Sequence, residues 1–152
     1  MSLYVRMEGI DKLGDFFVNV KENLVNRKTL DSMAEAAKRL VFERTAAARD
    51  IHGAPFKPYS KQYRKAREKR GLSGARVDLK STGEILGDIY TGSNPDRGMS
   101  TVSFNDGKSA FKAISHHEGR ARREFFGLDA SGQEDIERML EEHVSEVIKD
   151  AH

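Results

Sequence analysis

The sequence contains no cysteine, and this absence excludes two classes of architecture. Without thiols the chain forms neither a disulfide framework nor a cysteine-based zinc site, which fits a reducing compartment. It also lacks any run of about 18 consecutive apolar residues, the length that a membrane-spanning helix needs. The first residues show no basic stretch followed by an apolar core, so the sequence predicts no signal peptide. We therefore expect a cytoplasmic protein without membrane contact.

Recognisable catalytic patterns are missing too. The sequence has neither a Gly-x-Ser-x-Gly elbow nor a phosphate-binding glycine loop. Ser60 and Thr82 are explained by capping and turn roles. His116-His117-Glu118 suggests a metal site, but adjacent side chains of an extended segment point to opposite faces, and no His-Glu-x-x-His spacing follows. We predict no enzyme, no cofactor and no bound metal.

The remaining composition is that of one polar globular domain. Of the 152 residues, 38% are hydrophobic and 33% are charged, which is polar without being typical of disorder. A chain of this length buries roughly two-thirds of its unfolded surface when it folds. We predict a single domain over residues 1–152, with a flexible basic loop near residues 57–80.

Apolar periodicity indicates two long amphipathic helices. The first covers residues 29–51, with Thr29 as N-cap and Gly53 as its end. The second covers residues 131–149 and begins with a capping box from Ser131 to Glu134. Other segments have weaker patterns. These are a short strand over 3–8, a helix to about 26, a basic helix capped by Ser60 that runs to about Arg70, and a strand that begins somewhere after Thr82-Gly83.

Alternation indicates strands in the second half of the chain. Residues 99–104 alternate clearly, and residues 122–128 are interpreted as a final strand, whereas residues 108–116 fit either a helix or a strand. Helices that bracket a few strands define an α+β domain. We expect a small, mainly antiparallel sheet packed against the 29–51 and 131–149 helices.

Charge is distributed unevenly along the chain. Residues 56–80 contain nine basic and two acidic residues, a local charge of +7, whereas residues 124–150 contain two basic and nine acidic residues, a local charge of −7. Opposed blocks suit head-to-tail association, although they fit two solvated faces equally well. The candidate interface charges are Lys61, Arg64, Lys65, Arg67 and Arg70 in the basic block, and Glu134, Glu137 and Glu141 in the acidic block.

Four short blocks punctuate the chain between residues 53 and 128. Each pairs a turn-forming residue with a bulky apolar one, a combination that fixes corners and anchors them in a core. In Phe125-Phe126, we expect one ring in the core and the other against a helix or a neighbouring subunit. The blocks contribute Gly53, Phe56, Pro58 and Ser60; Thr82, Gly83 and Leu86; His116 and Gly119; and Arg123, Phe125 and Gly127.

In order and spacing these blocks resemble the virion morphogenesis family of long-tailed bacteriophages, the Mu-type tail-completion and neck proteins. The resemblance covers about residues 29–150. It departs from the family pattern where Ala121 and Glu124 replace prolines and Phe126 replaces a leucine. It implies a structural protein of the head–tail connector or tail terminus that assembles as a six-fold ring and contacts neighbouring neck or tail proteins. It also implies a structural hydrogen-bonding role for His116, and a phage or prophage protein found in the bacterial host cytoplasm and the virion.

A second hypothesis assigns the basic segment to nucleic acid. Residues 57–76 interleave Lys and Arg with Tyr59 and Tyr63, a combination that contacts phosphates and stacks on bases. The segment lacks a recognition-helix pattern, and the alternative is a subunit interface or a solvated loop. If it is an interface, we expect the loop from Gly71 to Lys80 to become ordered only when a neighbour docks.

Overall fold

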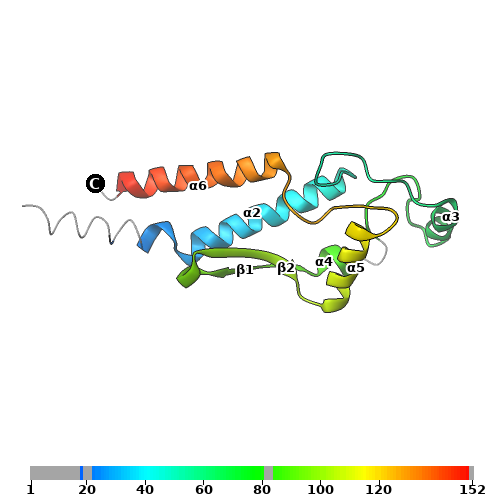
Figure 1. Cartoon of the computed structure of the whole chain (residues 1–152), viewed down its shortest axis with the longest axis horizontal. Helices are drawn as coiled ribbons and strands as arrows, with labels where there is room; N and C mark the ends of the chain where they lie inside the picture. The colour runs from blue at the N-terminus through cyan, green and yellow to red at the C-terminus, as the bar shows by residue number, and fades with distance from the viewer. Residues whose placement is uncertain (1–17, 19–21, 81–83, 151–152) are drawn as a thin grey trace, which may run out of the picture.

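Two long helices and a hairpin run along the length of the molecule (Figure 1). Helix α2 spans Arg27–Ala46 and helix α6 spans Ala130–Asp150. The hairpin packs on one side of α2 and α6 lies on the other, where Thr29 Oγ1 and His143 Nε2 are 3.0 Å apart. We had expected both helices to cover the sheet, but α2 lies between the sheet and α6. This computed structural model describes residues 18, 22–80 and 84–150.

The ends of α2 differ from the prediction. Asn26 is the N-cap, and its side chain accepts a hydrogen bond from the amide of Thr29, so Thr29 as N-cap is wrong. Asn is the stronger capping residue. The helix ends at Ala46 rather than near Gly53, and Ala48 has a φ of 58°. The carbonyl of Ala46 accepts a hydrogen bond from the guanidinium of Arg76, which satisfies one of the free carbonyls of the last turn.

The sheet is a two-stranded antiparallel hairpin. Strand β1 spans Ile89–Asn94 and β2 spans Met99–Phe104, with Ile89 opposite Phe104 and Asn94 opposite Met99. The short 3₁₀ helix η1, Pro95–Arg97, joins them. The hairpin is attached to α2 by side chains, including Ser100 Oγ, which donates to the carbonyl of Leu30 at 2.6 Å. The α+β class and the antiparallel pairing are confirmed, as is the strand over 99–104.

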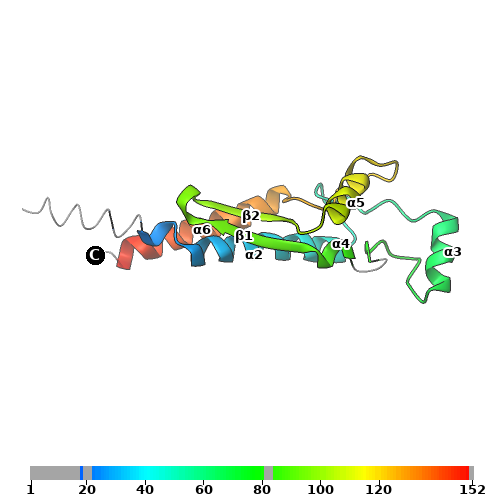
Figure 2. The ribbon, with the colours of Figure 1, turned by 90° about the horizontal axis from the view of Figure 1, so that it is seen from below.

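Three shorter helices lie toward the end of the molecule that is opposite the C-terminal end of α6 (Figures 1 and 2). Helix α4 spans Glu84–Gly87 and α5 spans Gly107–Glu118, which resolves the ambiguous segment 108–116 as helical. Helix α3, Lys61–Lys69, lies at the tip. As predicted, Ser60 caps this basic helix by accepting a hydrogen bond from the amide of Tyr63 at 3.2 Å.

The segment 122–128 is not a strand, so that prediction is wrong. Its backbone groups bond to loops and side chains instead of a neighbouring strand, as when the carbonyl of Glu124 accepts from the amide of Ile51 at 2.8 Å. The capping box of α6 is also wrong. Asp129 caps this helix, because its Oδ1 accepts from the amide of Gly132 at 2.7 Å. The predicted strand 3–8, most of the helix to residue 26, and Thr82-Gly83 lie outside the described residues.

Within the described residues, no helix combines the length and apolarity that crossing a membrane requires. The core lies where α2 ends and the chain gathers around Phe125. It joins residues distant in sequence, among them Val41, Phe56, Leu86 and Ala113.

Candidate functional site

Phe125 is the central residue of the region in which the sequence blocks meet. Its side chain is 0% exposed. The His117 ring meets it edge-on with centroids 5.7 Å apart, and the His116 ring does so at 6.2 Å. Phe126, half-buried, packs against Phe104 with centroids 4.7 Å apart. The rings of Phe125 and Phe126 lie 6.3 Å apart between centroids, and Phe126 packs against the same core cluster that contains Phe125, so the expected separation of the two rings is not found.

Arg123 joins three of the four blocks. Its Nε donates to the carbonyl of Lys57 at 3.0 Å, and its Nη2 donates to that of Pro58 at 3.2 Å. Its own amide donates to the carbonyl of His116 at 2.7 Å. Its guanidinium carbon lies 5.0 Å from the centroid of the Tyr59 ring. Burial lowers the pKa of Arg123, and the nearby Tyr59 opposes this shift. Arg123 therefore acts here as a structural hydrogen-bond donor.

Arg44, which sequence reasoning missed, holds the same segment from the other side. Its Nη2 donates to the carbonyls of Phe125 at 2.7 Å and Gly127 at 2.6 Å, and its Nη1 lies 3.6 Å from Asp129. Burial lowers its pKa, and the charge of Asp129 opposes that effect. The sequence could have indicated Arg44 by its position on the apolar face of the predicted helix, where an arginine needs internal partners. The backbone of Gly127 has a φ of 139°, a conformation that residues with a Cβ rarely adopt, so glycine suits this position.

Most of the block residues thus support the fold. Phe56, Leu86, Arg123 and Phe125 are buried. Gly119 is the C-cap of α5, where an added Cβ would lie only 2.3 Å from the carbonyl oxygen of Ser115. The remaining described members take turn, cap, half-buried or exposed positions around them: Gly53 with a φ of 78°, Pro58, Ser60, His116 and Gly127.

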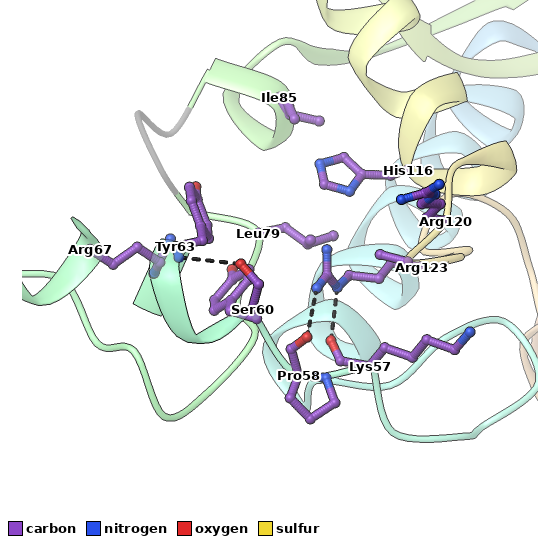
Figure 3. Close-up of a pocket in the computed structure, with 12 residues that line it drawn as sticks. Lys57, Pro58, Ser60, Tyr63, Arg67, Leu79, Ile85, His116, Arg120 and Arg123 are labelled. Atoms are coloured by element: carbon purple, nitrogen blue, oxygen red, sulfur yellow. Dashed lines mark hydrogen bonds between the residues drawn. The ribbon is translucent and has the colours of Figure 1, made fainter. Parts of the chain in front are cut away.

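An open pocket of about 570 Å³ adjoins this region (Figure 3). Figure 3 shows His116, Arg120 and Arg123 on one side of it, and Tyr63 and Arg67 on the other. Lys57 also lines it, and no aspartate or glutamate of the described residues does. The pocket is therefore a cationic hollow between α3 and the segment that follows α5.

Arg67 lies inside the subunit, which corrects its assignment as an interface charge. Its side chain is fully buried at 0% exposure. It donates to the carbonyls of Ser73 at 2.8 Å and Lys80 at 3.1 Å, and it pairs with Asp78 at 2.9 Å. It also lies over the Tyr59 ring, 4.7 Å from its centroid. Arg67 thus ties the loop that follows α3 to that helix. The mobility expected for the Gly71–Lys80 loop stays a prediction.

The other candidate charges are exposed on two separate elements. One set lies on or beside α3 at the tip of the molecule, and the other lies on α6, which runs toward the opposite end (Figure 1). The structure does not bring the two sets together within one subunit. The exposed residues are Lys61, Arg64, Lys65 and Arg70, and Glu134, Glu137 and Glu141.

The adjacent histidines have structural contacts of their own. His117 Nε2 accepts a hydrogen bond from the amide of Phe126 at 3.1 Å, so the hydrogen-bonding side chain is that of His117 rather than that of His116. Burial lowers the pKa of His116, and the neighbouring charges of Arg123 and His117 lower it further. Within the part of the chain that the structure describes, no cluster of three metal-ligating side chains is present.

Acidification is expected to destabilise the fold through His117. Its Nε2 accepts the Phe126 amide only while unprotonated. Burial lowers its pKa below the ordinary 6.5, opposed by Glu124 and Glu118. This contribution is therefore fully present above pH 6.5 and is lost as pH falls through the lowered pKa of the folded state. Urea unfolding measured from about pH 7.5 to about pH 5 tests this.

The matched variant for this experiment is His117→Gln. Its amide oxygen retains an acceptor and does not titrate. We expect a shallower loss of stability on acidification in this variant than in the wild type. An identical loss in both proteins would contradict the role given to His117.

None of the protein-family models, curated proteins and solved structures compared with the chain matches it. The resemblance to phage virion morphogenesis proteins therefore stays a prediction that depends on the four sequence blocks.

Proposed function

We propose that the chain is a non-enzymatic structural protein of a phage or prophage, acting at the head–tail junction or the tail terminus. The observation that supports this most is the convergence of the sequence blocks on the core around Arg123 and Phe125. The residues that carry the family resemblance build the subunit, and the charges outside that core stay exposed for association.

The working form in this proposal is a ring of identical subunits. A ring closed by head-to-tail contacts needs two different, complementary patches on each subunit. Exposed basic residues at α3 and exposed acidic residues on α6 provide two such patches. The resemblance implies six-fold symmetry, because such proteins lie on the axis of a tail built from six-fold layers.

Deleting the gene from the phage or prophage that encodes it tests this function. We expect particle assembly to stop, with infectivity restored by the wild-type gene supplied in trans. Free filled heads beside finished tails, seen by electron microscopy, would place the protein at the junction. Tails of uncontrolled length would place it at the tail terminus. Normal yields of joined, infectious particles would contradict the proposal.

Direct nucleic-acid binding is the second candidate, favoured by the exposed basic side chains of α3 and the adjacent cationic pocket. Phosphate contacts release counterions, so such binding weakens steeply as salt rises. Electrophoretic titration of a DNA duplex at two salt concentrations separates the candidates. Tight binding with a steep salt dependence favours nucleic acid, whereas weak binding at both concentrations favours the structural function.

A further inference from the structure

The cationic pocket offers charges that its own subunit leaves unpaired. Within the described residues, the Lys57 ammonium and the Arg120 guanidinium form no hydrogen bond or ion pair, although both line the pocket. The guanidinium of Arg123 adds a third positive charge. It donates to the carbonyls of Lys57 and Pro58 and lies over the Tyr59 ring, and no carboxylate of the described residues pairs with it. An anionic group placed here would gain charge-assisted hydrogen bonds without displacing an internal partner.

The pocket is also partly apolar, which restricts the kind of anion that fits. Leu79, Ile85 and Pro58 contribute to its wall, and the half-exposed ring of Tyr63 stands at its edge (Figure 3). Such a hollow matches a surface that carries an apolar side chain between carboxylates better than it matches a bare phosphate backbone.

Helix α6 presents a surface of that kind. Glu137, Leu140 and Glu141 are separated by three and four residues, so they lie on one face of the helix. All three are exposed, Leu140 by 41%. Neither glutamate has a side-chain partner in the part of the chain that the structure describes. Because α6 runs away from α3, this face is separate from the pocket of its own subunit (Figure 1).

We propose that the pocket lined by Lys57 and Arg120 binds the Glu137–Leu140–Glu141 face of α6 from a second copy of the chain. The two carboxylates pair with the unpaired cations, and Leu140 contacts the apolar wall. This inference rests on the ring of the proposed function and specifies its contact. Because donor and acceptor are different surfaces, the contact repeats head to tail.

Analytical ultracentrifugation of the purified protein over a concentration series, at low and high salt, tests the contact. We expect self-association at low salt that weakens as salt rises, because salt screens partly exposed charge pairs. Arg120→Glu and Glu137→Arg should each raise the dissociation constant roughly tenfold or more, since each places like charges opposite one another. A monomer at every concentration and salt would overturn the proposal.

Charge exchange makes the test specific. An equimolar mixture of Arg120→Glu and Glu137→Arg should associate again, because each variant retains the surface that complements the other. The controls are Lys108→Glu on α5, outside the pocket, and Glu142→Arg on a different face of α6, which should associate like the wild type. Failure of the mixture to associate while both variants remain folded by circular dichroism would overturn the pairing.

Binding of a labelled oligonucleotide to the wild type and to Arg120→Glu tests whether the pocket binds phosphate groups instead of carboxylates. If Arg120→Glu weakens oligonucleotide binding and leaves self-association unchanged, the pocket binds nucleic acid and the proposal falls. The tests also separate the two proposals. If the protein does not self-associate but deleting its gene stops particle assembly, the proposed function stands and the proposed contact falls. If the protein self-associates as expected but particles form normally without the gene, the contact stands and the proposed function falls.

Discussion

Replacing Arg67 with methionine is expected to lower the free energy of unfolding by about 2–4 kcal/mol. The side chain is fully buried, so its removal leaves the carbonyls of Ser73 and Lys80 without their donor. Asp78 also loses its cationic partner, but its Oδ1 still accepts from the amide of Lys80 at 2.9 Å, and its side chain is 28% exposed, so water offsets part of that loss. Urea unfolding followed by circular dichroism measures the change.

Two further variants make this result specific. Arg64→Met changes an exposed side chain of the same helix and should alter stability by no more than about 0.5 kcal/mol. Arg67→Lys retains the charge but lacks the planar fork that reaches three acceptors, so it should restore little of the loss. Equal stability of Arg67→Met and the wild type would show that this internal network does not stabilise the subunit.

Phe125→Ala is expected to cost about 3–5 kcal/mol, the range for removing a fully buried aromatic ring. The ring contacts His116, His117 and Phe126, and its loss leaves a cavity where the sequence blocks converge. Because total stabilities of domains are commonly about 5–15 kcal/mol, this variant should be close to unfolding. Thermal unfolding by calorimetry measures the change.

The control for Phe125 is Phe111 on α5, which is 69% exposed. Phe111→Ala should alter stability by no more than about 0.5 kcal/mol. If the two substitutions have similar effects, the core lies elsewhere than the structure places it.

Elements with strong local signals could be predicted from the sequence. The apolar stripes identified α2 and α6, alternation identified β2, and Ser60 identified the start of α3. Helix ends were less predictable, because they depend on which of several capping residues in a row is used. Asn26 instead of Thr29 caps α2, and Asp129 rather than Ser131 caps α6.

The segment 122–128 shows why the candidate site was only partly predictable. Its two adjacent phenylalanines have high strand propensity, but Arg44 supplies donors to its carbonyls in place of a neighbouring strand. That pairing is long-range, and no local pattern indicates it. Arg67 was wrongly assigned to an interface for the same reason, since a basic helix gives no sign of which cation faces inward. Of the block residues, Phe56, Leu86 and Phe125 meet in one core cluster, which no local pattern could show.

The hydrogen bonds from Arg44 to Phe125 and Gly127 bridge 81 and 83 positions of sequence, and that from Arg123 to Lys57 bridges 66. During synthesis at about 5–20 residues per second, roughly 4–16 seconds separate the translation of Arg44 from that of Phe125. For that interval the emerging helix α2 presents its apolar face to the cell without the residues that complete the core. The chain therefore depends on its last quarter for folding, and nascent subunits are exposed to chaperones or premature aggregation until that part leaves the ribosome.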